Sequence, residues 1–121
     1  MASFFHKKLP GYSTLLSGQQ PRDEYSFHSD RLQIWYNNTE RGWQDAAAHY
    51  HTDSDEVFIM LKGSIVVEVE GERVTIGPGE YCCFAAGVVH AVVEAHPPIE
   101  SLMLRAPSIS DKVYPEEGGI G

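Results

Sequence analysis

The chain has 121 residues, of which 42% are hydrophobic and 21% are charged, a composition that excludes disordered, collagen-like and coiled-coil classes. Nine Lys and Arg against 17 Asp and Glu give a net charge of -8, and such a surface repels nucleic-acid phosphates and anionic membranes. We predict a single domain over residues 1–121, with a peripheral N-terminal arm over about 1–22 and a peripheral C-terminal tail over about 107–121.

The sequence predicts no membrane-spanning segment. Its longest apolar runs, such as 57–61, are about five residues, whereas a membrane-spanning helix needs roughly 20. At the N-terminus the basic residues Lys7 and Lys8 follow Phe4 and Phe5, which is the wrong order for a signal peptide. We therefore expect a cytoplasmic protein.

Short β-strands, separated by Gly, Pro, Asn and Asp, account for the middle of the chain. About eight such segments follow one another at spacings of about 8–12 residues, which is typical of an all-β sandwich or barrel. The first is expected to stop at the Asn37–Asn38 pair, and the second and third, on either side of Gly63, to form a meander with the fourth. The clearest predicted strands cover residues 31–36, 56–62, 64–70, 73–76, 80–84, 88–95 and 99–106.

Two of these segments, 57–61 and 65–67, are apolar on both faces. An antiparallel strand with one face in water alternates apolar and polar residues, so both faces must be covered. A barrel buries the inner face, and a second subunit or the N-terminal arm would cover the outer one. We predict a homodimer.

The two cysteines, Cys82 and Cys83, are neighbours on a predicted strand. Adjacent strand residues point to opposite faces, so a disulfide between them is geometrically poor. Either thiol could face the barrel interior as a soft ligand, but a free cysteine in a strand usually behaves as a small buried hydrophobe.

Three segments carry side chains that suit a transition metal. His49 and His51 alternate on an extended segment, which places both imidazoles on one face about 6–7 Å apart. Glu56 opens the next strand and His90 opens a later one. Imidazole and carboxylate donors suit Fe, Mn, Ni, Co, Cu or Zn. A single histidine is more often a surface or hydrogen-bonded residue, and the pair alone leaves both interpretations open.

The residues around this set form a frame of glycines. Gly42 is followed after six residues by His49–Tyr50–His51, then after four by Glu56, and after six more by Gly63. This frame resembles the first motif of the cupin superfamily, with one extra residue after Gly42. The spacing of ligand types and glycines together is much more specific than the histidine pair.

A second stretch resembles the second cupin motif. Gly79 is followed by Ala85, Gly87, His90 and Glu94 at the family's spacing. Ala85 stands where the family usually has proline, which could loosen the turn that aims His90, and Glu94 stands where it usually has asparagine. Neither departure touches a ligand position.

The resemblance covers Gly42 to Glu94 and implies a small single-domain cupin. It implies an all-β jelly-roll barrel (a double-stranded β-helix), usually dimeric. It also implies one divalent transition metal per chain (Fe, Mn, Ni or Zn), held by His49, His51, Glu56 and His90.

The expected pocket around the ion is largely apolar. Phe58 and Met60 share the face of Glu56, and Tyr36, Trp35 and Trp43 are candidates near its mouth. Such a lining suits a small organic ligand or substrate. Core packing is an equal alternative for Phe58 and Met60, and a slightly weaker one for the other three. The surface acidity is expected to disfavour strongly anionic substrates.

Three further residues are not expected to bind the metal. Tyr50 should point away from the metal, and His28 and His96 fit no ligand spacing, with His96 expected in an exposed turn.

The metal site is better defined than the reaction. A metal-dependent enzyme acting on a small organic molecule is the first hypothesis, with an oxygenase favoured among oxygenases, isomerases and lyases. No catalytic residue besides the ligands is assigned. The alternatives are a non-catalytic cupin that binds or senses a small ligand through the metal, and a structural barrel whose histidines hold no metal.

Overall fold

The computed structural model describes residues 4–43 and 45–115, and every regular element within them is a β-strand. No helix long and apolar enough to span a membrane occurs among these residues. The strands are β1 (Thr14–Gly18), β2 (Phe27–His28), β3 (Gln33–Thr39), β4 (Asp45–His51), β5 (Asp55–Val69), β6 (Glu72–Ile76), β7 (Tyr81–Phe84), β8 (His90–Ala106) and β9 (Lys112–Val113).

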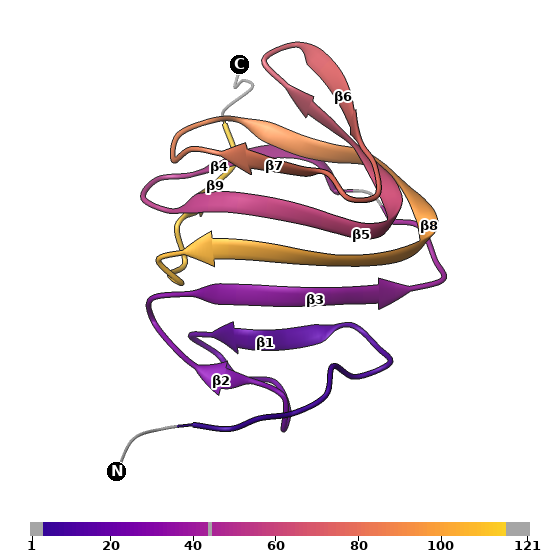
Figure 1. The fold of residues 1–121 in the computed structure, drawn as a ribbon. Coiled ribbons are helices and arrows are strands. Elements are labelled where there is room, and N and C mark those ends of the chain that lie inside the picture. The colour runs from indigo at the N-terminus through magenta and orange to yellow at the C-terminus, as the bar shows by residue number, and fades with distance from the viewer. Residues whose placement is uncertain (1–3, 44, 116–121) are drawn as a thin grey trace.

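Two long antiparallel strands, β5 and β8, run side by side through the whole fold (Figure 1). The first half of β5 pairs with the second half of β8, and these halves are flanked by β7 and by β3 with β1 and β2. The remaining halves pair with each other and are flanked by β6 and by β4 with β9. The chain therefore has the all-β jelly-roll architecture expected from its sequence.

Both long strands bend at the same level. The pairing between them steps from Lys62 opposite Glu100 to Ser64 opposite His96, so β8 carries extra residues where β5 has only Gly63. Proline has no N–H to donate, and the Pro97–Pro98 pair interrupts the ladder there. Gly63 has φ +75, a left-handed conformation that L side chains rarely adopt. The bend lets each strand contribute to two sheets.

The apolar core lies between the sheets. Its members are buried aliphatic and aromatic side chains from both layers: Met60, Ile65, Val67, Ile76, Phe84, Val92 and Ile99. Phe58 and Trp43 pack against this cluster. Phe84 of this core also contacts His90, so the core packs directly against one of the predicted ligands.

Three of the predicted strand boundaries are wrong. Segments 56–62 and 64–70 are one strand, β5, so they do not pair with each other; only the hairpin of β5 with β6 remains from the predicted meander. Segments 88–95 and 99–106 likewise join as β8 across Pro97–Pro98. Gly63 and the prolines bend a continuous strand instead of reversing the chain.

The third error concerns the end of β3, which continues through Asn37 and Asn38 to Thr39. Cross-strand pairing with Ser101 and Glu100 on β8 outweighs the turn preference of asparagine. The Asn37 amide also donates a hydrogen bond to Ser101 Oγ over 3.2 Å.

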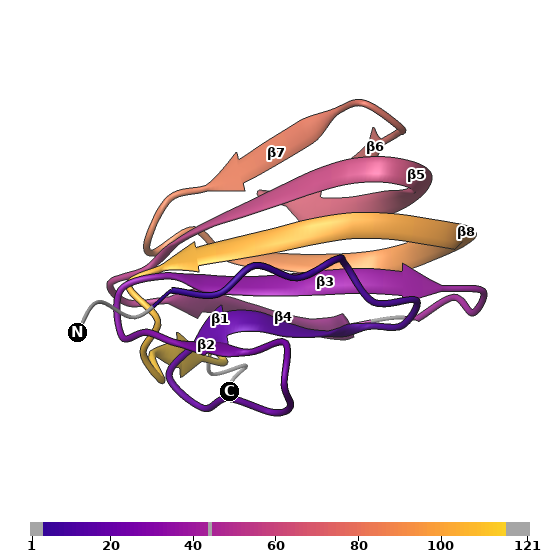
Figure 2. The same cartoon turned by 60° about the horizontal axis from the view of Figure 1, so that its bottom comes forward.

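The described parts of the two terminal segments supply strands at the edges of the sheet. The N-terminal segment supplies β1, which pairs with β3 (Figure 2), and its first residues lie beside β2, where the Phe5 and Phe27 ring centroids are 5.9 Å apart. The C-terminal segment supplies β9, which pairs with β4. Segment 107–113 therefore lies directly beside His51.

Replacing Gly63 tests the importance of the bend. A Cβ at this position would lie 2.5 Å from Pro98 O and 2.8 Å from His96 O. We expect Gly63→Ala to lower the free energy of unfolding by roughly 2–5 kcal/mol, through the left-handed backbone and the clash together. Gly71 has φ +81 but nothing within 4 Å of its Cβ position, so Gly71→Ala should cost only about 1–2 kcal/mol. Equal losses in urea unfolding would show that the close contact at the bend is unimportant.

Candidate metal centre

Four buried side chains from three strands converge at one point inside the barrel. His49 and His51 project from β4, Glu56 from the start of β5 and His90 from the start of β8. His49 and His90 are directly opposite each other in the β4–β8 pair. One potential ligand atom from each residue lies within 4.8 Å of the others, and none of the four residues is more than 5% exposed. The sequence had selected these same four residues.

The Nδ1 atom of each histidine is held by an oxygen acceptor. His49 Nδ1 lies 3.1 Å from Ala47 O, and His90 Nδ1 lies 3.0 Å from Val88 O. His51 Nδ1 lies 3.1 Å from a carboxylate oxygen of Asp111. An oxygen acceptor requires the hydrogen on Nδ1, which leaves Nε2 of each neutral ring as the nitrogen able to bind a metal.

The His90 ring is also fixed in its plane. Phe84 stacks on it with a centroid distance of 3.9 Å and an interplanar angle of 4°. Because the hydrogen bond to Val88 O and this stacking act together, the ring has one preferred orientation.

Two atoms that can each bind a cation, His90 Nε2 and Glu56 Oε1, meet at the centre of the cluster. His90 Nε2 lies 2.7 Å from Glu56 Oε1, although both are acceptors when the ring is neutral and the carboxyl ionised, so this contact requires a shared proton. Burial alone would raise the pKa of Glu56, but the hydrogen bond and charge of His90, with smaller effects of His51 and His49, lower it. Glu56 is therefore held as a carboxylate.

A second observation supports a cation at this place. His51 Nε2 is the buried side-chain nitrogen that lacks a hydrogen-bond partner within the described part of the chain, and it lies 3.7 Å from Glu56 Oε1. Burial lowers the pKa of His51 and the positive charge of Arg105 lowers it further, against the opposing effects of Glu56 and Asp111. A neutral ring with an unpartnered nitrogen is ready to bind a metal, so the donor set fits a divalent transition ion.

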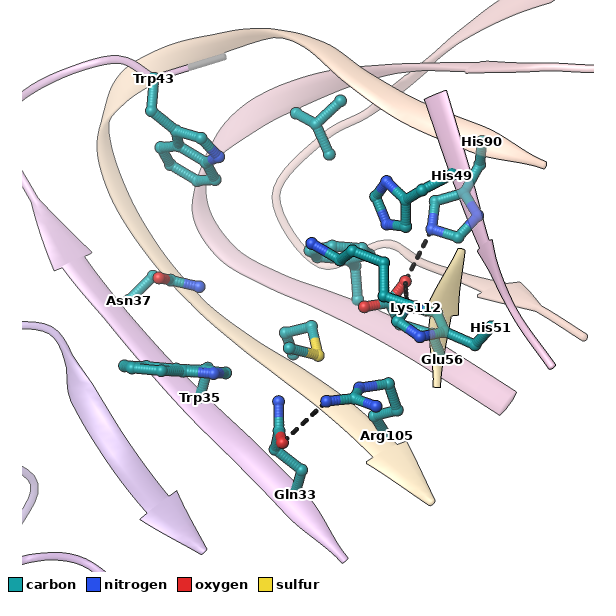
Figure 3. Close-up of a pocket in the computed structure, with 13 residues that line it drawn as sticks. Gln33, Trp35, Asn37, Trp43, His49, His51, Glu56, His90, Arg105 and Lys112 are labelled. Carbon is teal, nitrogen blue, oxygen red and sulfur yellow. Dashed lines mark hydrogen bonds and ion pairs between the residues drawn. The ribbon is translucent and has the colours of Figure 1, made fainter. Parts of the chain in front are cut away.

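The cluster forms one side of a cavity of about 250 Å³ (Figure 3). Trp35, Trp43 and Phe58 line it, as the sequence suggested, but Tyr36 and Met60 do not. Tyr36 is on the opposite face of β3 and donates a 2.5 Å hydrogen bond to Glu100, while Met60 lies wholly in the core. The rest of the lining is Gln33, Asn37, Val92, Met103, Arg105 and Lys112.

Comparison with known proteins agrees with this geometry. The profile of the cupin domain family matches residues 38–98, which include all four converging residues and about half of the chain. The chain belongs to the cupin family. No curated protein matches the chain.

Several solved structures have a similar fold. KdgF from Halomonas sp. has a TM-score of 0.60 at 24% identity, over 69% of this chain and 76% of that one. Pac13 from Streptomyces, described as a nucleoside dehydratase, has a TM-score of 0.59 at 15% identity, over 72% and 70%. The DMSP lyase DddQ from Ruegeria pomeroyi has a TM-score of 0.59 at 23% identity, over 84% of this chain and 50% of that one. At such identities these likenesses show the fold alone.

Asp111, which the sequence analysis missed, supports the converging histidines of this cupin through His51. Asp111 accepts hydrogen bonds from the backbone N–H groups of Asp53 and Ser54 at 2.9 and 2.8 Å, and it contacts Arg105 at 3.0 Å. Burial would raise the pKa of Asp111, but these hydrogen bonds and that from His51 lower it to about 2. Asp111 lies 60 residues from His51, so no local pattern pointed to it.

Arg105 was also missed, although it left a signal. It is the one charged residue between Ser101 and Ala106 in an otherwise apolar stretch of β8. Its guanidinium donates hydrogen bonds to Ile109 O, Asp111 Oδ1 and Gln33 Oε1. A charge on the inner face of a strand that lines a barrel suggests a role in the interior.

The turn that precedes His90 is well held despite Ala85. Val88 N–H donates to Ala85 O over 3.1 Å, and Gly87 N–H donates to His51 O over 2.8 Å. Ala86 N–H donates to an Asp55 carboxylate oxygen over 2.9 Å. These three hydrogen bonds fix the turn that leads into His90.

The two cysteines and the remaining histidines lie away from the cavity. Cys82 packs against the core, and burial raises the pKa of its thiol to about 11, while Cys83 is exposed. His96 is exposed and lies 3.0 Å from Glu94, and His28 is exposed on β2. Cys82 is thus partly buried against the core, in line with the packing role that the sequence favoured for a cysteine in this strand.

Replacing Asp111 tests whether it strengthens metal binding by holding His51. We expect Asp111→Asn to lower metal affinity about 10–100-fold, because the amide no longer fixes the His51 tautomer with a full negative charge. Competition with a chromophoric chelator measures this, on protein whose circular dichroism is native. Asp53→Asn is the control, since the exposed Asp53 side chain accepts a hydrogen bond from Thr52 and is not one of the converging residues. Equal affinities of the two variants would contradict the assignment.

Proposed function

We propose that this cupin is a metal-dependent enzyme that acts on a small organic molecule in the barrel cavity. The observation that carries the proposal is the convergence of four buried nitrogen and oxygen donors on the wall of a cavity of about 250 Å³. His49, His51, Glu56 and His90 would hold one divalent transition ion, with Fe, Mn, Ni and Zn as the candidates. Such an ion would supply Lewis-acid or oxygen-activating chemistry.

The protein's own residues bind and orient the substrate. Trp35, Phe58 and Met103 offer apolar surface beside the cluster and exclude water from it. The fixed rings of His49, His51 and His90 pre-organise the site, because Asp111 and two backbone carbonyl groups already hold their tautomers.

Oxygenation is the reaction that we propose first. A set of histidine and carboxylate ligands that leaves coordination positions open is typical of non-haem iron enzymes that use dioxygen. Elimination is the second candidate, since two proteins of the same fold, Pac13 and DddQ, are described as a dehydratase and a lyase.

Removing one ligand tests the metal site. We expect His51→Ala to lower bound metal several-fold in elemental analysis of the purified protein, because only three of the four ligand residues remain. His96→Ala should leave the metal content unchanged, since His96 is exposed and outside the cluster. The same metal content in both variants would refute the four-ligand assignment.

Oxygen consumption separates the candidate reactions. Protein is loaded anaerobically with Fe(II), Mn(II), Ni(II) or Zn(II) and screened against small organic molecules. Substrate-dependent oxygen uptake with Fe(II) is expected for an oxygenase, whereas anaerobic turnover supports elimination. Tight ligand binding without turnover under any condition would instead favour the non-catalytic alternative.

We also propose that two copies associate through the outer face of the sheet around β5 and β8. The register aligns the aliphatic residues of this outer face: Ile34, Leu104 and Val57 in one row, and Leu102 and Ile59 in the next. All five are only half-buried in the single chain. The N-terminal arm reaches Ile34 but leaves a second cavity, of about 450 Å³, beside it.

Sedimentation tests the dimer. We expect the protein at micromolar concentration to have twice the mass of the chain, and Ile59→Glu to dissociate it, because a buried charge opposes association. Val74 on β6 is 41% exposed and does not belong to this set of five residues. The Val74→Glu variant should therefore remain a dimer. A wild-type protein that sediments as a monomer would contradict the proposal.

A further inference from the structure

Two basic side chains, Arg105 and Lys112, line the cavity beside the candidate metal centre. Their positions follow from strand register, since residues directly opposite each other share a face. Lys112 on β9 is opposite His51, and Arg105 on β8 is opposite both Glu56 and Gln33. Both therefore project from the same inner face as the four predicted metal ligands (Figure 3).

Arg105 is fixed in place before any ligand arrives. Nη1 donates to Ile109 O over 2.6 Å and to Asp111 Oδ1 over 3.0 Å, and Nη2 donates to Gln33 Oε1 over 2.9 Å. A guanidinium has five N–H donors, so these contacts leave donor capacity for a ligand. A rigid guanidinium loses little conformational entropy when it binds a carboxylate.

Lys112 is more exposed and reaches across the cavity (Figure 3). Its ammonium lies 5.8 Å from the ring centre of Tyr114, whose ring is 6.1 Å from that of His49. Within residues 4–43 and 45–115, the structure shows no carboxylate in ion-pair contact with Lys112. This ammonium is therefore available to an anionic group of a ligand.

The charge of the cavity is opposite to that of the chain as a whole. The chain has 17 acidic residues against nine basic ones, yet the cavity lining has one acidic residue, Glu56, against two basic ones. Asp111 offsets Arg105 from behind. A divalent ion on the four ligands would leave an excess of positive charge in a partly buried space, which a bound anion would neutralise.

We propose that the cavity binds a small organic carboxylate, with the carboxylate group between Lys112 and Arg105. This inference rests on the proposed function for the ion, and it names the class of molecule that the same site accepts. The planar guanidinium of Arg105 matches a carboxylate, and Trp35, Phe58 and Met103 provide apolar surface for the carbon skeleton. It also reverses the expectation that acidity disfavours anionic substrates, because the interior differs in sign from the surface.

Tryptophan fluorescence can report binding directly. The chain has two tryptophans, Trp35 and Trp43, and both line this cavity. Zn(II)-loaded protein is titrated with succinate, lactate and benzoate, each compared with its uncharged amide, and with inorganic phosphate. We expect at least one carboxylate to bind ten or more times tighter than its amide and tighter than phosphate. No preference over the amides, or a preference for phosphate, would overturn the proposal.

Lys112→Gln tests the assigned contact. We expect it to weaken the preferred carboxylate about tenfold and to leave amide binding unchanged, because one charge-assisted contact is lost. Lys62→Gln, at an exposed lysine on β5 away from the cavity, should behave as wild type. Carboxylate affinity unchanged by Lys112→Gln would contradict the proposal.

Metal content separates this proposal from the proposed function. Zinc is measured in the wild type and in both lysine variants, and each titration is repeated on metal-free protein. A protein that binds zinc but no carboxylate refutes the present inference alone. A protein that binds no metal refutes the proposed function, and the Lys112-dependent difference between carboxylate and amide in metal-free protein then decides the present inference by itself.

Discussion

The shared bend of β5 and β8 determines where the functional side chains lie. Glu56 begins β5 and His90 begins β8, and along the flat ladder they would be far apart, since Glu56 pairs with Arg105 and Val69 pairs with His90. Bending both strands at Gly63 brings the two sheets face to face. Glu56 Oε1 then lies 2.7 Å from His90 Nε2. The candidate metal centre is thus a consequence of the two-layer fold.

The residues around this centre make polar contacts that a purely apolar core would not contain. Three imidazole Nδ1 atoms have oxygen partners, one buried carboxylate is surrounded by rings, and Asp111 is itself held by two backbone N–H groups. Each buried polar group is costly unless it is partnered. The unpartnered His51 Nε2 is therefore informative, because it is aimed at the place where a cation would satisfy it.

Much of the site was predictable because its signal is local. His49 and His51 alternate within one strand, and Glu56 and His90 follow glycines at fixed spacings, so the family resemblance identified all four. Asp111, Arg105 and Lys112 were not predictable in the same way. They reach the site through pairing of β9 with β4 and of β8 with β5, and this pairing joins residues far apart in the sequence. The strand boundaries predicted at Gly63 and at Pro97–Pro98 were wrong for a related reason. Glycine and proline usually end a strand, but here pairing with neighbouring strands on both sides keeps β5 and β8 continuous.

The central claim is that His49, His51, Glu56 and His90 hold one divalent metal ion. Anomalous diffraction from crystals of the metal-loaded protein, recorded at the absorption edge of the metal, tests it most directly. The account predicts a single strong peak about 2.0–2.2 Å from the Nε2 atoms of the three histidines and from a Glu56 carboxylate oxygen. A peak elsewhere, or no peak at the cluster in protein shown to contain the metal, would contradict it.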